Sequence, residues 1–200
     1  MYAEVAVVAA TGLEAKEARR ALPGLRVFER GIGLSKGRGG FGGAAVTCGL
    51  AGALRSGLPS GTVLVPAEVV RPDGSRRRCD PVLVATFAEA ARSLGFEPVL
   101  DPLYTATAIV RGNQRADLAR GGCAGVDMET GLLEAPRIAA VRVVLDTPER
   151  ELTANWLNPM RALLDPRNWP EAAWLGRDAP RYARRSAAVI AAACLQAGVT

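Results

Sequence analysis

The sequence predicts one α/β domain: a mostly parallel, mixed sheet flanked by helices, followed by a helical C-terminal tail. Three observations carry this prediction. Two hundred residues is the size of one ordinary domain. Strand-like apolar runs alternate with helix-like stretches, and neither a linker nor a repeat divides residues 1–200. Aromatic residues make up only 5% of the chain, which favours aliphatic strands buried beneath helices.

The N-terminal segment begins like a doubly wound domain. Residues 2–10 are mainly apolar and predict a buried parallel strand. Residues 13–22 predict a helix, which Pro23 and Gly24 end. A short strand is expected at 25–29.

A glycine-rich segment follows at residues 31–43, where seven of thirteen residues are glycine. Residues 37–42 match GxGxxG formally. No good helix follows the match, and no acid stands about 20 residues later, so a dinucleotide-binding fold is not predicted. A flexible connection and a loop that faces phosphate or ribose both remain open.

The middle of the chain predicts a strand at 44–48 and then a tight turn at 49–54, where two glycines allow close backbone approach. A strand at 61–70 is expected to be interrupted at Pro66, and residues 80–94 predict an amphipathic helix. The remaining expected elements are strands at 98–100, 105–110 and 138–145, helices at 114–119 and 129–135, and a tail at 151–200 that closes with a helix at 181–196.

The complete lack of histidine narrows the chemistry. It removes the usual general base, the usual metal ligand and every Ser-His or Cys-His pair. Acid–base work must then fall to carboxylates with shifted pKa values, or to Lys, Tyr or Cys. The four cysteines form no CxxC pair, so no metal site is predicted. Scattered thiols indicate a reducing, cytoplasmic location, with a disulfide as the alternative.

The charge balance is modest, at +5. It is typical of a soluble, mildly basic protein. Residues 76–78 are three consecutive arginines, usually a solvated loop, and no aromatic platform stands beside them, so nucleic acid is not an expected partner. No apolar run reaches the roughly 18 residues of a membrane span.

Two apolar runs end on carboxylates, and such strand ends are where open α/β sheets place their chemistry. One run leads to Asp127 and Glu129, the other to Asp146. Structural alternatives exist for each acid. Glu129 could favour a helix start that Asp127 caps, Asp146 could be a turn acid, and Glu14 could be a solvated helix residue paired with a basic neighbour.

Four segments, in their order along the chain, resemble signature sites of the nucleoside phosphorylase and nucleosidase superfamily. They are Gly12-Leu13-Glu14-Ala15, residues 47–54 together with 60–65, Val126-Asp127-Met128-Glu129, and Arg142-Val143-Val144-Leu145-Asp146. The chain is most similar in style to the small methylthioadenosine/S-adenosylhomocysteine nucleosidases and to hopanoid-associated phosphorylase-like proteins. The resemblance implies an enzyme that cleaves an N-glycosidic bond.

The resemblance also implies a role for each matched residue. Glu129 would hold the ribose hydroxyls, and Met128 would pack under the sugar or base. Asp146 would protonate the purine N7 or share a proton with it. Glu14 would orient the attacking water, with Glu17 as the alternative on the same helix.

Further positions would contact the substrate. These are Ile109, Gly33, Gly49 and Ala51. No metal or cofactor is implied, and phosphate enters only as a co-substrate if the protein is a phosphorylase. These implied roles are chemically consistent with glycoside cleavage. The reaction passes through an oxocarbenium-like state that carboxylates stabilise, and an acid that burial keeps protonated helps the base to leave.

Departures from the family pattern affect the choice of substrate. Leu50 stands where phosphate-using members often have Ser or Thr, and its side chain cannot donate to phosphate, which favours hydrolysis. Thr62 stands where the family pattern has an acid. Ala108 and Ile109 lie where an aromatic often stacks on the base, which argues against familiar substrates such as methylthioadenosine. A phosphorylase, a futalosine-type nucleosidase and a non-catalytic nucleoside-binding homologue remain alternatives.

The tail is rich in Trp and Arg, and the compact chain resembles superfamily members that remove adenine from an adenosylated hopane. Its mixture of side chains could line an apolar channel, rest on a membrane surface, or simply pack onto the core or a partner subunit. The tail residues concerned are Trp156, Leu157, Met160, Arg161, Leu163, Leu164, Arg167, Trp169, Trp174 and Arg177. By analogy with superfamily relatives, a homo-oligomer is expected.

Overall fold

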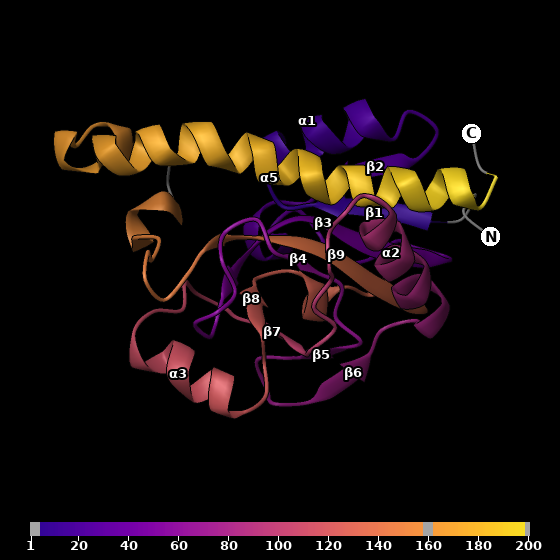
Figure 1. The fold of residues 1–200 in the computed structure, drawn as a ribbon, viewed down its shortest axis with the longest axis horizontal. Coiled ribbons are helices and arrows are strands. Elements are labelled where there is room, and N and C mark those ends of the chain that lie inside the picture. The colour runs from indigo at the N-terminus through magenta and orange to yellow at the C-terminus, as the bar shows by residue number, and fades with distance from the viewer. Residues whose placement is uncertain (1–4, 158–161, 199–200) are drawn as a thin grey trace.

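The computed structural model describes residues 5–157 and 162–198, in which one mixed sheet is covered by helices (Figure 1). The strands are β1 (Val5–Ala9), β2 (Arg26–Glu29), β3 (Ala44–Ala53), β4 (Val63–Leu64), β5 (Glu68–Val70), β6 (Arg76–Arg78), β7 (Leu103–Thr105), β8 (Gly125–Asp127) and β9 (Arg137–Asp146). The α-helices are α1 (Gly12–Ala21), α2 (Pro81–Ser93), α3 (Asn113–Arg120) and α5 (Trp169–Gln196). Short 3₁₀ turns are η2 (Ile32–Leu34), η3 (Thr130–Leu132), η4 (Ala154–Leu157) and η5 (Pro166–Asn168).

The predicted fold class is confirmed. The strand order is β2-β1-β3-β8-β7-β5-β6, while β9 pairs with β3 and β4. Pairing is parallel in β1–β2, β1–β3, β3–β9, β5–β7 and β7–β8, and antiparallel in β3–β8, β4–β9 and β5–β6. The predicted helical C-terminal tail is also present, as α5.

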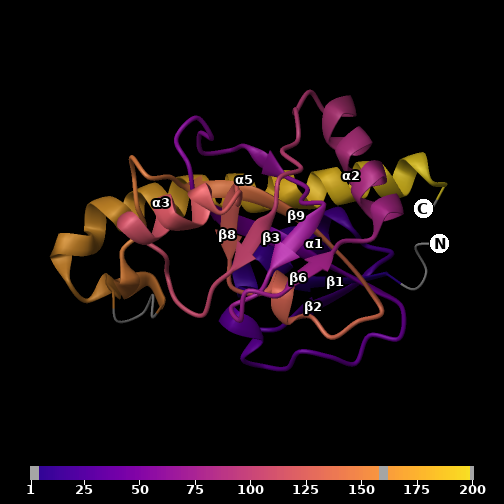
Figure 2. The same ribbon diagram turned by 90° about the horizontal axis from the view of Figure 1, so that it is seen from below.

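The centre of the sheet is the parallel pair β3–β9, whose register begins with Ala44 opposite Arg137. Both strands are buried almost throughout, as expected where helices cover a parallel sheet. The helices α5, α1 and α2 lie on the same side of the sheet, whereas α3 lies away from them (Figures 1 and 2). The buried Ser186 hydroxyl of α5 donates to the Val141 carbonyl (2.7 Å) and accepts from the Gly49 amide (2.9 Å).

The tight turn expected at residues 49–54 is wrong, because β3 continues to Ala53. Pairing with β9 continues into this segment as far as Gly52 opposite Asp146. The ladder hydrogen bonds therefore outweigh the weak strand preference of two glycines. Gly49 has a φ of 148°, a conformation that glycine adopts readily.

Three shorter expectations also need correction. The strands expected at 98–100 and 105–110 are replaced by β7, with only an isolated bridge at Val99. The helix expected at 129–135 is the single turn η3. The arginine run expected as a loop is the edge strand β6, where Arg77 donates to the Leu133 carbonyl at 2.9 Å. The expected interruption at Pro66 is present, between β4 and β5.

The C-terminal helix begins at Trp169, twelve residues before the expected start at 181. Pro170 fits the first helical turn, where no amide partner is lost, and Pro180 lies within the helix. Trp174 is buried and stacks with Arg150, whose Cζ lies 4.1 Å from the ring centre. This part of the tail therefore packs onto the core, as one of the alternatives held. Met160 and Arg161 lie outside the described residues.

All four cysteines are free and buried. Burial raises the pKa of the Cys48 and Cys79 thiols to about 12, so both are protonated and unreactive at neutral pH. None of the helices within residues 5–157 and 162–198 combines the length and hydropathy that crossing a bilayer requires.

Candidate active site

The candidate site lies where β3 changes its neighbour. Val8 opposite Thr47 is the last pair between β1 and β3, and Gly52 opposite Val126 is the first between β3 and β8. Between these pairs, one edge of β3 faces no strand. Such changes of neighbour open a crevice at the strand ends, which is the usual ligand site in open α/β sheets.

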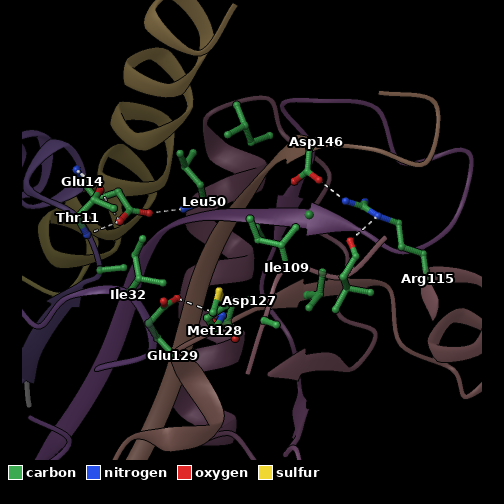
Figure 3. A pocket seen from close by; sticks show the side chains of 17 residues that line it. Thr11, Glu14, Ile32, Leu50, Ile109, Arg115, Asp127, Met128, Glu129 and Asp146 are labelled. Atoms are coloured by element: carbon green, nitrogen blue, oxygen red, sulfur yellow. Dashed lines mark hydrogen bonds and ion pairs between the residues drawn. The ribbon is translucent and has the colours of Figure 1, made fainter. Parts of the chain in front are cut away.

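A cavity of about 180 Å³ occupies this place. Its side chains come from the start of α1, the turn η2, the ends of β3, β8 and β9, the loop before α3, and α3 itself (Figure 3). Glu129 and Asp146 face the same hollow from opposite ends. The lining residues are Ala10, Thr11, Glu14, Ile32, Leu50, Ala51, Gly52, Ala108, Ile109, Val110, Arg115, Val126, Asp127, Met128, Glu129, Leu145 and Asp146.

Arg142 lies behind one end of the cavity, on β9, and is only 1% exposed. Its Nη2 atom contacts Asp127 Oδ2 at 2.7 Å and Glu129 Oε2 at 2.9 Å, and its Nη1 atom lies 3.9 Å from Glu14 Oε1. One guanidinium thus serves three buried carboxylates. If all three were ionised the cluster would carry a charge of −2, which favours retention of a proton by one of them.

Glu129 is a member of this cluster whose pKa is raised. Its Oε1 atom accepts from the Gly33 amide at 3.0 Å, and its side chain is 5% exposed. Burial raises the pKa of Glu129 to about 7, reinforced by the charges of Asp127 and Glu14 and opposed by Arg142. A carboxyl with this pKa changes its charge at neutral pH, as an acid–base or ribose-binding group would.

Glu14 joins helix α1 to the unpaired edge of β3. Its Oε2 atom accepts from the Thr11 amide and hydroxyl, both at 2.8 Å, while Thr11 caps α1 in return. Its Oε1 atom accepts from the Leu50 amide at 2.8 Å. Glu14 is therefore a buried cavity residue and not a solvated helix acid. The alternative, Glu17, pairs with Arg184 at 3.0 Å and does not line the cavity.

Asp127 has the structural role that the sequence left open for it. Its Oδ2 atom accepts from the Thr130 amide at 3.1 Å, which holds the turn after β8, and its Oδ1 atom accepts from the Thr105 hydroxyl at 2.8 Å. Glu129, by contrast, makes no capping hydrogen bond to the η3 turn. The two acids of this motif therefore have different roles. Asp127 holds the backbone of the turn after β8, whereas Glu129 lines the cavity together with Met128.

Asp146 ends β9 at the other end of the cavity. Its Oδ2 atom accepts from Arg115 Nη2 and from the Leu152 amide, the latter at 3.4 Å. Burial raises the pKa of Asp146, and Arg115 opposes this effect. Burial has the larger effect on this pKa, because Asp146 and Arg115 are both withdrawn from water and a buried ion pair recovers only part of its desolvation cost.

The four other predicted substrate contacts fall into two groups. Ala51 and Ile109 line the cavity. Gly33 and Gly49 do not, and each supports an acid instead. Gly33 donates to Glu129, and a Cβ atom on Gly49 would come within 2.0 Å of Glu14 Oε1, so glycine makes room for that carboxylate. None of residues 37–42 lines the cavity.

Two arginines at the candidate site, Arg142 and Arg115, have no role that the sequence predicts. Arg142 was noted only as part of a motif, although a lone charge inside a buried strand is a usable signal, because such a charge needs partners. Arg115 lies in a helix with no family motif and gives no comparable signal. Among the described residues, no three Cys, Asp or Glu side chains are grouped as metal ligands.

The proton on Glu129 yields a stability prediction. Because its pKa near 7 exceeds the value of about 4.3 for an unfolded chain, its stabilising effect is full below that value and is lost as pH rises through 7. Glu129→Gln removes this dependence. Between pH 4 and pH 8, the free energy of unfolding of the variant should improve relative to wild type by up to about 3 kcal/mol.

Urea unfolding at several pH values measures this difference. Glu134→Gln, an exposed acid just after η3, is the matched control and should follow wild type. Parallel pH profiles for wild type and Glu129→Gln would show that Glu129 holds no such proton.

No protein-family model matches the sequence, and no curated protein matches it. Solved structures do match its fold. The methylthioadenosine/S-adenosylhomocysteine nucleosidase of Neisseria meningitidis, in complex with methylthio-immucillin-A, is 16% identical with a TM-score of 0.72, over 96% of this chain and 98% of that chain.

Two proteins of Helicobacter pylori are similar as well. A mutant nucleosidase with 5′-methylthioadenosine in its active site is 11% identical with a TM-score of 0.69, over 96% of this chain and 98% of that chain. A futalosine hydrolase is 13% identical with a TM-score of 0.69, over 96% and 97%. At these identities the likeness concerns the fold. The chain therefore shares its fold with these nucleosidases and with futalosine hydrolase, the fold that the sequence resemblance implied.

Proposed function

We propose that the protein hydrolyses the N-glycosidic bond of a purine nucleoside. One observation carries this proposal: Glu14, Glu129 and Asp146 come from distant parts of the sequence and line one cavity. Neighbours with the same fold, named as nucleosidases and a futalosine hydrolase, support the reaction type.

At the sugar end, Glu129 accepts from the ribose hydroxyls and Met128 packs against the sugar. As the glycosidic bond lengthens, positive charge grows on the sugar ring. The carboxylate cluster of Glu14, Asp127 and Glu129 stabilises this charge, because electrostatic interactions are strong in a buried site. Arg142 offsets part of the negative charge of the cluster, which allows the three carboxylates to be buried together.

Glu14 is the base for the attacking water. Both of its oxygens already accept hydrogen bonds from groups of α1 and β3, so its orientation is fixed before substrate binds. A carboxylate oxygen has lone pairs for more than one donor, and a water between Glu14 and the anomeric carbon would give its proton to this side chain.

At the opposite end, Asp146 donates a proton to the base nitrogen as the bond breaks. Its burial favours the protonated form, which a general acid requires. The base itself would lie against the aliphatic side chains of Ile109, Val110 and Val126.

Water is a better nucleophile for this cavity than phosphate. The backbone amides of Gly49 and Leu50 donate to Ser186 and Glu14. The cavity lining contains four carboxyl groups and one guanidinium. A phosphate dianion would therefore meet repulsion, and both of these amides already donate to other groups.

The aliphatic lining also supports a substrate with an apolar portion. Ile32, Leu50 and Ile109 face the cavity, and no aromatic side chain is among its lining residues in the described chain. We therefore include adenosylated apolar metabolites, such as an adenosyl-hopane, in the substrate class.

A substrate panel tests the proposal. Purine nucleosides, methylthioadenosine, futalosine and an adenosyl-hopane are supplied with and without phosphate, and free base and sugar product are measured. We expect base release without phosphate, together with a free reducing sugar. Strict phosphate dependence with a sugar phosphate product would establish a phosphorylase, and tight binding without cleavage would establish a non-catalytic homologue.

Substitution of the acids gives a second prediction. Glu14→Gln and Asp146→Asn should each lower kcat by on the order of 10²-fold or more, because each removes a proton-transfer group. Glu17→Gln is the matched control: it lies on the same helix and is equally buried, but it faces Arg184. Full turnover in Asp146→Asn would exclude that residue as the acid.

We also infer that the chain forms a homo-oligomer, and size-exclusion chromatography with light scattering tests this.

We further infer that the tail contacts a membrane peripherally through residues 163–169. Leu164 is 83% exposed and Trp169 is 60% exposed, with the basic Arg167 between them. Apolar and basic side chains together favour an anionic lipid surface.

Co-sedimentation with phosphatidylglycerol vesicles tests the membrane contact. Leu164→Ser/Trp169→Ser should weaken vesicle binding several-fold, whereas Leu195→Ser, an exposed leucine at the other end of α5, should not. Equal binding by all three proteins would exclude the contact.

A further inference from the structure

Arg115 is a charged residue of the cavity wall that belongs to none of the four family-like segments. It lies on α3 and is 2% exposed. Its guanidinium bonds to three separate elements: Asp146 Oδ2 at the end of β9, the Ala53 carbonyl at the end of β3, and the Val110 carbonyl before α3, the last at 3.1 Å. This arrangement fixes the guanidinium in place beside Asp146.

Gly52 locates the pair within the cavity. A Cβ atom at this position would lie 2.9 Å from Asp146 Oδ1 and 3.4 Å from Arg115 Nη1. Both groups therefore lie against the same glycine of the cavity wall; Figure 3 shows Asp146 and Arg115 directed toward each other. Because Oδ2 is occupied by Arg115, Oδ1 is the oxygen that remains for the departing base.

We propose that Arg115 is a positioning residue for the leaving group: it holds Asp146 by one oxygen, presents the other to the base, and stabilises the carboxylate that forms when the proton leaves. This inference rests on the proposed N-glycosidic hydrolysis. In that step the C–N bond pair moves to the base, the Asp146 proton moves to a base nitrogen, and Asp146 becomes a carboxylate beside the guanidinium.

The effect is specific to the transition state. A neutral carboxyl gains little from a neighbouring guanidinium, whereas a carboxylate gains much in a buried site. Arg115 therefore stabilises the charge that develops during the reaction more than it stabilises the ground state, and such an interaction raises kcat.

The surroundings of Asp146 determine the sign of the pH effect. The charged groups at this end are Arg115 from α3 and Glu151 from the segment after β9, with Glu151 Oε1 lying 3.3 Å from Arg115 Nε. Arg111 pairs with Glu151 at 3.4 Å on the exposed side. Since Arg115 lowers the pKa of Asp146, its removal raises that pKa, and the protonated acid persists to higher pH.

The test compares Arg115→Gln, Arg115→Lys and the control Arg111→Gln. For Arg115→Gln we expect kcat to fall about tenfold or more with little change in KM, and the alkaline limb of the pH–kcat profile to move up by about one pH unit. Arg115→Lys should restore part of both, and Arg111→Gln should match wild type. A fall in kcat without movement of the limb would show a merely structural role.

A double-mutant cycle provides a second readout. If Arg115 acts through Asp146, then Arg115→Gln should cost little in a protein that already carries Asp146→Asn. Independent losses that multiply would overturn the proposal.

An NMR titration of the Asp146 carboxyl carbon tests the pairing without reference to turnover. Its midpoint should rise in Arg115→Gln, or in Arg115→Lys by a smaller amount if the Gln variant does not fold. If the midpoint shifts in Arg115→Gln but wild type releases no base, the proposed hydrolysis is refuted while the pairing of Arg115 with Asp146 is supported. An unshifted midpoint would refute the role of Arg115 whatever the enzyme does.

Discussion

The contact between Arg142 and three carboxylates is the constraint on which the rest of the site depends. Glu14 lies more than a hundred positions before Asp127 and Glu129 in the sequence, and without a shared cation the three carboxylates could not be buried together. The long parallel pairing of β3 with β9 brings Arg142 to this place, opposite Gly49. The buried β3–β9 pair thus carries the positive charge of Arg142, which the three carboxylates require.

The change of neighbour along β3 explains why the site is here. Where β1 ends and β8 has not yet begun, the strand has backbone groups without a partner strand. Buried backbone groups must be satisfied, and the Leu50 amide is satisfied by Glu14. The same hydrogen bond that completes the sheet therefore orients the candidate catalytic base, so that fold and site share one interaction.

Much of this arrangement was readable from the sequence, because carboxylates at the ends of apolar runs show where parallel strands finish. This reasoning predicts Asp127, Glu129 and Asp146, whereas Glu14 is indicated only by the family resemblance of residues 12–15. The error at residues 49–54 has a physical reason: local glycine preference indicates a turn, but whether a strand continues depends on its neighbours, here β9 and β8. Arg115 could not be assigned for a related reason, since its partners Ala53, Val110 and Asp146 are set by tertiary contacts.

The proposed reaction in a chain without histidine uses carboxyl groups alone, and the environments of the three carboxyls differ. Glu14 is surrounded by donors from a helix start and a strand edge, which suits a base. Glu129 lies among other acids and keeps its proton to about pH 7. Asp146 is separated from that cluster and has its own guanidinium. Two arginines at opposite ends of one cavity thus give the Glu14–Asp127–Glu129 cluster and Asp146 separate cationic partners. This separation is what the proposed reaction needs, because its proton acceptor and its proton donor are different carboxyl groups.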